Sequence, residues 1–158
     1  SEESIYYHFK DIKDLLQVTL KGFLSKIKHR FGGDLTGISG ALNKLRKMIW
    51  VHIHTYSSNP VLAKMLLLDA KNCPEYYKSD SYSLVKEYSD MVLSIVEDGI
   101  ESGEIRDDIP SSLIRQGILG CVENTCLTHI LFNREFDADE LTDDICELLF
   151  SGMANKKA

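Results

Sequence analysis

Residues 4–10, SIYYHFK, hold the side chains whose types and spacing point most directly to a binding role. On a short helix, Ile5 and Phe9 lie one turn apart and pack inward. The side chains that then face outward are Ser4, Tyr7 and His8. Their hydroxyl and imidazole groups can donate hydrogen bonds to phosphates, which is typical of a helix that contacts a nucleic-acid backbone. An ordinary aromatic helix packed on its neighbour is the alternative.

No pattern in the sequence supports catalysis or metal binding. His52 and His54 lie two residues apart, so a regular helix turns them about 200° from one another and they cannot bind one ion together. The four cysteines, which form no C-x-x-C pair, are Cys73, Cys121, Cys126 and Cys146. That pattern favours free thiols in a reducing compartment. The sequence also lacks a nucleophile–base pair and a phosphate-binding loop, so we expect neither an enzyme nor a metal or cofactor.

The composition is that of one globular domain. The chain has 158 residues, of which 44% are hydrophobic and 27% are charged, which allows a substantial core and excludes a disordered chain. No apolar run approaches the ~18 residues that span a bilayer, and the first residues are polar, unlike a signal peptide. We expect a soluble, cytoplasmic protein that does not associate with membranes.

Charge is unevenly distributed along the chain. The net charge is −6, yet residues 1–30 carry six Lys and Arg against four Asp and Glu, and the rest carry twelve against twenty. A mildly basic end on an acidic body suits contact with a polyanion at that end only. An ordinary solvated face explains so small an excess equally well.

Apolar residues recur with helical spacing along nearly the whole chain, and no segment alternates long enough for a strand, so the predicted fold class is all-α. The predicted helices cover residues 11–31, 36–57, 60–73, 75–102, 110–133 and 137–154. Asn59 is the expected N-cap of the third helix, with Pro60 in its first turn. Gly103 follows the fourth helix as a C-terminal glycine. Asp137 and Glu140 form a capping box for the last helix.

The helix at residues 111–133 is apolar on more than one face. Such a helix either lies in the middle of its own domain or covers a core on one side and a partner on the other. We expect the helices at 111–133 and 137–154 to pair with their copies in a second chain, as an intermolecular four-helix bundle. A fully internal helix is the alternative.

The segment SIYYHFKD at residues 4–11, followed by Leu15 and Leu16, resembles the end of the DNA-binding domain of TetR-family repressors. There, the second helix of a helix-turn-helix leads into a long connecting helix. The resemblance implies that Tyr6 reaches a base edge or a phosphate. The residues that it implies as further DNA contacts are Ser4, Tyr7, His8, Lys10 and Lys13. Ile12 stands where the family usually has a phosphate-binding Lys, so Lys10 or Lys13 would take over that contact.

The same resemblance divides the chain. Residues 1–10 are the expected remnant of the helix-turn-helix, residues 11–31 the connecting helix, and residues 36–155 the ligand-binding and dimerisation domain. The first helix and most of the first half of the helix-turn-helix would precede Ser1, and the recognition helix needs them as supports. We therefore expect specific binding of an operator by the full-length protein only.

Two further stretches resemble the fatty-acid-degradation regulators of that family, which release DNA on binding acyl-CoA. They are NPVLAKMLLLDAKN at residues 59–72 and GIESGEIRDDIPSSLIRQGILGCVENT at residues 99–125. The second stretch is common to many TetR-like proteins. In the first, Asp69 stands where a Glu is usual and Lys71 where an Arg is usual. The implied effector is an acyl-CoA or a fatty acid, and both residues belong to its expected site.

An effector site in a helical bundle is an apolar cavity with a few polar groups that orient the ligand. The expected wall residues are Met48, Met65, Leu66, Tyr88, Met91, Val92, Ile95, Ile118 and Val122. For any single one of them, packing in a core without a cavity is the better explanation. Glu123, Asn124 and His129 would orient a ligand, pair across a dimer or face water. The basic residues expected at the CoA phosphates are Lys71, Arg106 and Arg115.

We interpret the chain as a dimeric, all-α regulator of the TetR type, a repressor that a hydrophobic effector releases from DNA by moving the helix that begins at Asp11. A coupling of ~1–3 kcal/mol suffices for such a switch. A multidrug-type sensor is the alternative within the family, and acidic residues such as Glu97 and Glu101 suit its cationic ligands. A stand-alone dimeric interaction module is the alternative from another class.

Overall fold

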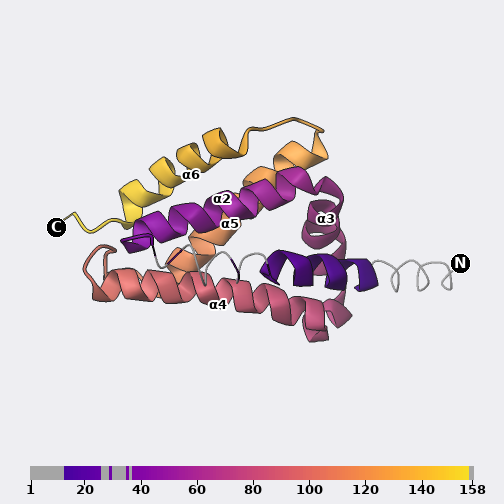
Figure 1. Cartoon of the computed structure of the whole chain (residues 1–158), viewed down its shortest axis with the longest axis horizontal. Helices are drawn as coiled ribbons and strands as arrows, with labels where there is room; N and C mark the ends of the chain where they lie inside the picture. Colours follow the sequence, from indigo (N-terminus) through magenta and orange to yellow (C-terminus); the bar gives the residue numbers. More distant parts are fainter. Residues whose placement is uncertain (1–12, 26–28, 30–34, 36, 157–158) are drawn as a thin grey trace, which may run out of the picture.

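The structure is a computed structural model that describes residues 13–25, 29, 35 and 37–156. It begins with a helix at residues 13–25 (Figure 1). The elements that follow are α2 (Ala41–Ser58), α3 (Pro60–Lys64), the π-helical turn η1 (Met65–Asp69), the 3₁₀ turns η2 (Ala70–Asn72) and η3 (Pro74–Lys78), α4 (Asp80–Glu101), α5 (Ser111–Leu131) and α6 (Ala138–Met153). The predicted all-α fold class is confirmed. Among the described residues, β-type pairing is limited to one isolated bridge between Ile105 and Ala154.

α2 is the central helix. It packs against α4, α5 and α6, and Figure 1 shows α6 and α4 on opposite sides of it. The helix at residues 13–25 buries Leu16, Leu20 and Leu24 against the body. The Ser81 hydroxyl at the start of α4 donates to Gln17 Oε1 on this helix at 2.7 Å. Within the described ranges, none of the helices is long and apolar enough to cross a membrane.

The N-terminal end of α2 is tightly packed. Gly99 on α4 approaches α2 so closely that a Cβ there would lie 2.7 Å from the Cβ of Ala41 and 2.6 Å from Ile105 Cδ1. Glu104 accepts hydrogen bonds from the backbone N–H groups of Ala41 (2.5 Å) and Leu42 (3.0 Å). The carboxylate thus satisfies donors that the first turn of a helix leaves without partners. We call this region, Ala41 with Gly99, Glu104 and Ile105, the solid end of α2.

Two helix starts differ from the predictions. α2 begins at Ala41 rather than near residue 36, directly after Gly40, whose φ is 87°. α4 begins at Asp80 rather than at residue 75, because the Ser79 hydroxyl accepts a hydrogen bond from the Tyr82 N–H at 3.2 Å and caps the helix there. The predicted helix at 60–73 is α-helical only to residue 64 and continues as π and 3₁₀ turns.

The predicted caps have mixed outcomes. Asn59 occupies the N-cap position of α3 and Pro60 its first turn, as predicted, but the Asn59 side chain does not cap the helix. Its Nδ2 instead donates to the Thr55 carbonyl at 3.1 Å at the end of α2. The C-terminal role of Gly103 is confirmed by its φ of 78°. Asp137 Oδ1 accepts a hydrogen bond from the Glu140 N–H at 3.0 Å, as expected for the N-cap of α6.

Candidate ligand-binding site

A cavity of about 390 Å³ lies between the helix at residues 13–25, α2, α3 with the η1 turn, α4 and α5. Its wall is mostly apolar and aromatic, with polar groups at a few points, which is the usual make-up of a small-molecule site. The lining residues are Leu20, Phe23, Leu24, His52, Thr55, Tyr56, Leu62, Leu66, Tyr82, Leu84, Val85, Lys86, Tyr88, Ser89, Asp90, Arg115, Gln116, Leu119 and Glu123.

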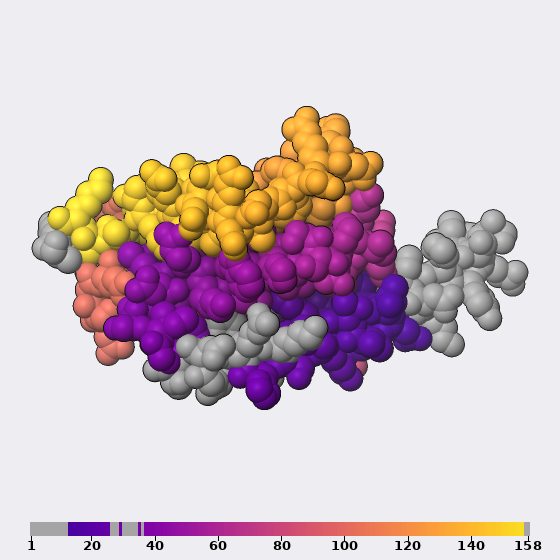
Figure 2. Space-filling view, turned by 45° about the horizontal axis from the view of Figure 1, so that its top comes forward, coloured from indigo at the N-terminus to yellow at the C-terminus, as the bar shows by residue number. Residues whose placement is uncertain are grey.

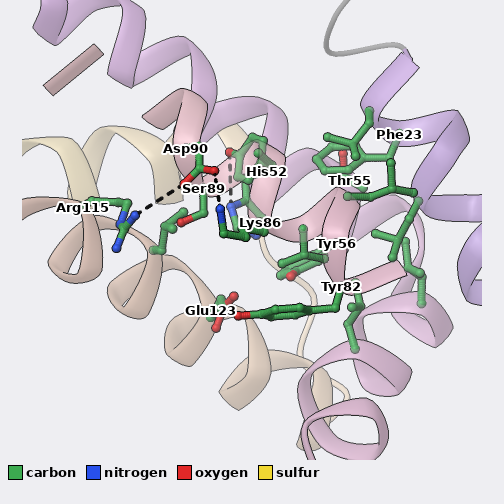
Figure 3. A pocket seen from close by; sticks show the side chains of 18 of the residues that line it. Phe23, His52, Thr55, Tyr56, Tyr82, Lys86, Ser89, Asp90, Arg115 and Glu123 are labelled. Atoms are coloured by element: carbon green, nitrogen blue, oxygen red, sulfur yellow. Dashed lines mark hydrogen bonds and ion pairs between the residues drawn. The ribbon is translucent and has the colours of Figure 1, made fainter. Parts of the chain in front are cut away.

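Charged side chains gather at one end of this cavity (Figure 3). Asp90 lies 3.0 Å from Lys86 Nζ, one turn away on α4, and 3.8 Å from an Arg115 guanidinium nitrogen on α5. The side chains of Lys86 and Asp90 are more than half exposed, whereas that of Arg115 is 21% exposed. We call these three residues the charged mouth. It joins two helices and carries one more positive charge than negative.

A neutral polar cluster lies deeper in the wall. The Tyr88 hydroxyl donates to the Met48 carbonyl at 3.3 Å and lies 3.4 Å from His52 Nδ1. The Tyr56 ring meets the His52 ring edge-on, with 4.7 Å between centroids. Burial lowers the pKa of His52 to about 4, against a smaller opposite influence of Glu123, so the imidazole is neutral at pH 7. Burial likewise raises the pKa of Tyr88 above its usual range. The cluster therefore offers hydrogen bonds without charge.

Glu123 on α5 forms a third polar point. Lys71 Nζ in η2 lies 2.5 Å from its carboxylate, so the negative charge of this cavity residue is balanced from outside the cavity. The Tyr82 ring points toward Glu123 in Figure 3. Tyr82 also packs on Tyr76 and Tyr77, with 5.6 and 5.2 Å between ring centroids. This side of the cavity is bordered by the Tyr82 ring and by Glu123 of the ion pair.

Known proteins are similar to this one along nearly the whole chain. A TetR-type family, described as YsiA-like protein, C-terminal region, matches residues 16–152. The chain belongs to the TetR family. The fatty acid metabolism regulator protein of Bacillus subtilis (strain 168) is 27% identical to it over 156 residues, which are 99% of this chain and 80% of the relative.

Solved TetR-type structures have the same fold. The transcriptional regulator FadR from Bacillus subtilis in complex with stearoyl-CoA matches with a TM-score of 0.78 and 27% identity, over 96% of this chain and 82% of that one. The fatty acid degradation regulator FadR from Bacillus halodurans matches with a TM-score of 0.74 over 89% of this chain and 70% of that one. At 18% identity, this second likeness shows the fold alone.

The cavity of this TetR-family chain includes some of the predicted ligand residues and not others. Those that line it are Leu66, Tyr88, Arg115 and Glu123. Those that are buried in the core without lining it are Met48, Met65, Val92, Ile95, Ile118 and Val122. Met91 is half-buried and does not line the cavity either. For the residues outside the lining, a direct ligand contact stays a prediction.

The two other predicted phosphate ligands are paired with carboxylates. Arg106 makes two hydrogen bonds of 2.6 Å to Asp108 and a third of 3.2 Å to the Gly152 carbonyl at the end of α6. Lys71 reaches the cavity only through its ion pair with Glu123. Neither side chain lines the cavity.

The remaining predicted site residues lie elsewhere. Asp69 and Asn124 are exposed, and Asp69 borders a separate hollow of about 70 Å³ together with Lys13. Of the predicted DNA contacts, Lys13 is exposed at the start of the first described helix. The others lie outside the described residues; they are Ser4, Tyr6, Tyr7, His8 and Lys10.

Sequence reasoning missed two contributions to the cavity. The apolar stripe of the helix at residues 13–25 is evident in the sequence, but only its packing against α2 and α4 turns Phe23 toward the cavity. Lys86 and Asp90 have the spacing of a helical ion pair beside the apolar stripe of α4, a signal that could have placed the mouth. In the described part of the chain, no group of three or more His, Cys, Asp or Glu side chains could hold a metal ion.

Proposed function

We propose that the chain is the effector-binding part of a repressor that responds to long-chain acyl-CoA. The observation that carries this proposal is one cavity that combines an apolar wall with a charged mouth. The wall suits an acyl tail, and guanidinium and ammonium groups at the mouth suit the phosphates of CoA. The relation to the Bacillus subtilis regulator, whose structure holds stearoyl-CoA, supports the same class of ligand.

The charged mouth can exchange one anion for another. Lys86 and Arg115 both contact the Asp90 carboxylate, and a phosphate with its additional charge and acceptor oxygens can take the place of Asp90 beside both cations. Asp90 is half exposed, so the ion pairs that it gives up are weak. Since Lys71 and Arg106 do not line the cavity, we assign the phosphates to Lys86 and Arg115.

The effector would act through the helix at residues 13–25. Leu20 and Leu24 of this helix line the cavity, and the predicted DNA contacts at residues 4–10 precede it in the chain. A ligand that touches the helix can favour a helix position different from that of the operator complex, and ~1–3 kcal/mol of coupling is enough. Adding palmitoyl-CoA to the full-length protein should therefore release its operator DNA, and unchanged operator affinity would contradict this mechanism.

Isothermal titration of the chain tests the ligand class, with palmitoyl-CoA, CoA and palmitate as separate probes. We expect palmitoyl-CoA to bind more tightly than either fragment. Arg115→Ala should weaken palmitoyl-CoA binding about tenfold or more, because it removes charge-assisted hydrogen bonds to phosphate. Lys44→Ala, a control outside the cavity, should leave the affinity unchanged.

Two outcomes would contradict the assignment. If palmitate binds as tightly as palmitoyl-CoA and Arg115→Ala has no effect, the mouth does not hold CoA phosphates. If palmitoyl-CoA does not bind, the effector is of another class. A hydrophobic cation is the second candidate, because Asp90 and Glu123 line the same cavity, and titration with ethidium would identify it.

We also propose that α5 and α6 pair with a second copy of the chain. The large apolar side chains exposed on these helices include Leu113, Leu131 and Leu148, of which Leu148 is 67% exposed. Figure 2 shows α6, orange to yellow, along one side of the molecule. Exposed large apolar side chains on neighbouring helices are typical of an interface, and two helices from each copy would form a four-helix bundle.

Native mass spectrometry of the chain tests the dimer. The wild type should be dimeric, and Leu148→Glu should shift it toward the monomer because it places a charge in the apolar interface. Val61→Glu, at an equally exposed apolar position on α3, is the matched control and should stay dimeric. A monomeric wild type would contradict the proposal.

A further inference from the structure

A second hollow adjoins the ligand cavity. It measures about 340 Å³ and lies between the helix at residues 13–25 and the C-terminal end of α2. The residues that line both spaces are Phe23, Thr55 and Leu62. The two spaces are therefore neighbours across a boundary made of three side chains, and what holds that boundary in place decides whether a ligand can extend from one space into the other.

Phe23 is the adjustable part of this boundary. The Thr55 hydroxyl donates to the Val51 carbonyl at 2.7 Å, and Leu62 is only 6% exposed, so both are held by their surroundings. Phe23 is half-buried, and its ring makes a tilted contact with Tyr88 at 5.8 Å between centroids. An aromatic contact of this kind is weak compared with full burial of a side chain, so the ring can change rotamer.

There is space on the far side of the boundary. Gly22, which precedes Phe23, lines the second hollow, and a Cβ built on it would meet no atom within 4 Å. In Figure 3, Phe23 and Thr55 lie at the end of the cavity opposite to Arg115 and Asp90. A tail whose head group is at the charged mouth would therefore run toward Phe23.

We propose that Phe23 is a specificity-determining residue that sets the upper limit on the length of the acyl chain. Its ring closes the inner end of the cavity, and a tail that is longer than the cavity must displace the ring and enter the second hollow. This inference rests on the proposed function, because it takes an acyl-CoA as the ligand and the charged mouth as the site of its head group.

The physical basis is the gain in affinity for each buried methylene. Burying one more CH₂ group increases affinity by about fourfold while the tail still meets apolar wall. Once the tail reaches Phe23, a further methylene gains little, because displacing the ring removes its contact with Tyr88 and the second hollow also presents polar groups such as His54 and Asn59. Affinity should therefore rise with chain length and then level off.

The test is a series of titrations of the chain with octanoyl-, dodecanoyl-, hexadecanoyl- and eicosanoyl-CoA. In the wild type, affinity should increase steeply at first and level off within the series. Phe23→Ala should move the levelling point to longer chains, with a gain of tenfold or more over the wild type for the longest. Phe23→Trp, which enlarges the ring, should move the levelling point to shorter chains.

Controls separate this inference from the proposed function. Val18→Ala changes an exposed side chain on the same helix and should reproduce the wild-type series. If Phe23→Ala is too unstable to titrate, Phe23→Trp alone decides, because an unchanged levelling point in that variant would overturn the role of Phe23. An unchanged levelling point in both variants overturns the inference and leaves acyl-CoA as the effector. No binding of any acyl-CoA by the wild type overturns the proposed function and this inference together.

Discussion

At the N-terminal end of α2, Gly99 lies so close to Ala41 that a single added methyl group would overlap it, whereas at the C-terminal end His52, Thr55 and Tyr56 border a cavity of about 390 Å³. One helix thus has a solid end and a hollow end. The solid end is closed by packing and by the Glu104 carboxylate. The hollow end is lined by groups that a ligand can contact.

The contrast between the two ends of α2 shows the structural role of the stretch that resembles TetR-type regulators. GIESGEIR at residues 99–106 holds Gly99, Gly103, Glu104 and Ile105, which build the solid end and the turn after α4. This stretch is therefore explained by packing and helix capping. The cavity is built instead from residues of five helices and the η1 turn, and its specificity depends on which of these side chains face each other.

The largest expected effect concerns the hollow end, which should be the pH-sensitive one. Burial lowers the pKa of His52 from 6.5 to about 4, so the unfolded chain takes up a proton at a higher pH than the folded chain. The contribution of neutral His52 to the free energy of unfolding is fully present above pH 6.5. As the pH falls toward 4, the free energy of unfolding decreases by about 3 kcal/mol. Urea unfolding at a series of pH values measures it.

The matched variants for this prediction are His52→Phe and His54→Gln. His52→Phe, without a titrating ring, should lose about 3 kcal/mol less between pH 7 and 4 than the wild type. His54→Gln changes an exposed position two residues further along α2. Its stability should depend on pH as that of the wild type does. If His52→Phe and the wild type lose the same stability in acid, His52 is not the cause of the pH sensitivity that we assign to the hollow end.

Gly99→Ala tests the solid end. The new Cβ would lie 2.7 Å from the Cβ of Ala41 and 2.6 Å from Ile105 Cδ1, so α2 and α4 must move apart, at a cost of about 2 kcal/mol of unfolding free energy. Gly22→Ala is the control, since its Cβ meets nothing within 4 Å and alanine favours a helix by up to about 1 kcal/mol. If both variants shift the thermal midpoint in the same direction, close packing does not define the solid end.

Glu104→Gln tests how much the capping carboxylate stabilises the solid end. The amide keeps the shape of the side chain but replaces one of the two carboxylate oxygens that accept hydrogen bonds from the first N–H groups of α2, and it removes the negative charge. We therefore expect the free energy of unfolding to fall by about 1 kcal/mol. Glu101→Gln, at an exposed position at the end of α4, should cost little. Chemical denaturation of the two variants side by side is the measurement, and equal stabilities would exclude a capping role for Glu104.

The smallest expected effect concerns the ion pair between Arg46 and Asp143, which joins α2 to α6 at 2.5 Å. Its side chains are 44% and 75% exposed, so water screens the pair and Asp143→Asn should cost less than about 0.5 kcal/mol. Unfolding at low and high salt should show little difference between variant and wild type. A loss above about 1 kcal/mol would mean that surface charge, as well as packing, holds α6.

The helical class and most helix positions were predictable because apolar residues at helical spacing leave few alternatives. Gly103 and Asp137 were also predictable, since both act within one or two turns of their own helix. The start of α4 at Asp80 was not predictable, because two start signals compete: Ser79, which caps the helix, and Pro74, five residues earlier. The residue types at Met65–Asp69 do not distinguish the π-helical turn found there from an α-helix.

The sequence by itself determined that the chain is all-α, that it belongs with TetR-type regulators, and that Arg115 and Glu123 are polar residues on an apolar helix. The helical class and the polar positions depend on local spacing and residue type, whereas the family was implied by the resemblance of whole stretches to TetR-type regulators. Only the tertiary structure decided that Lys86 and Asp90 share a mouth with Arg115, that Arg106 is bound to Asp108 instead, and that Phe23 separates two hollows. Such relations depend on how helices cross, which short-range periodicity does not encode.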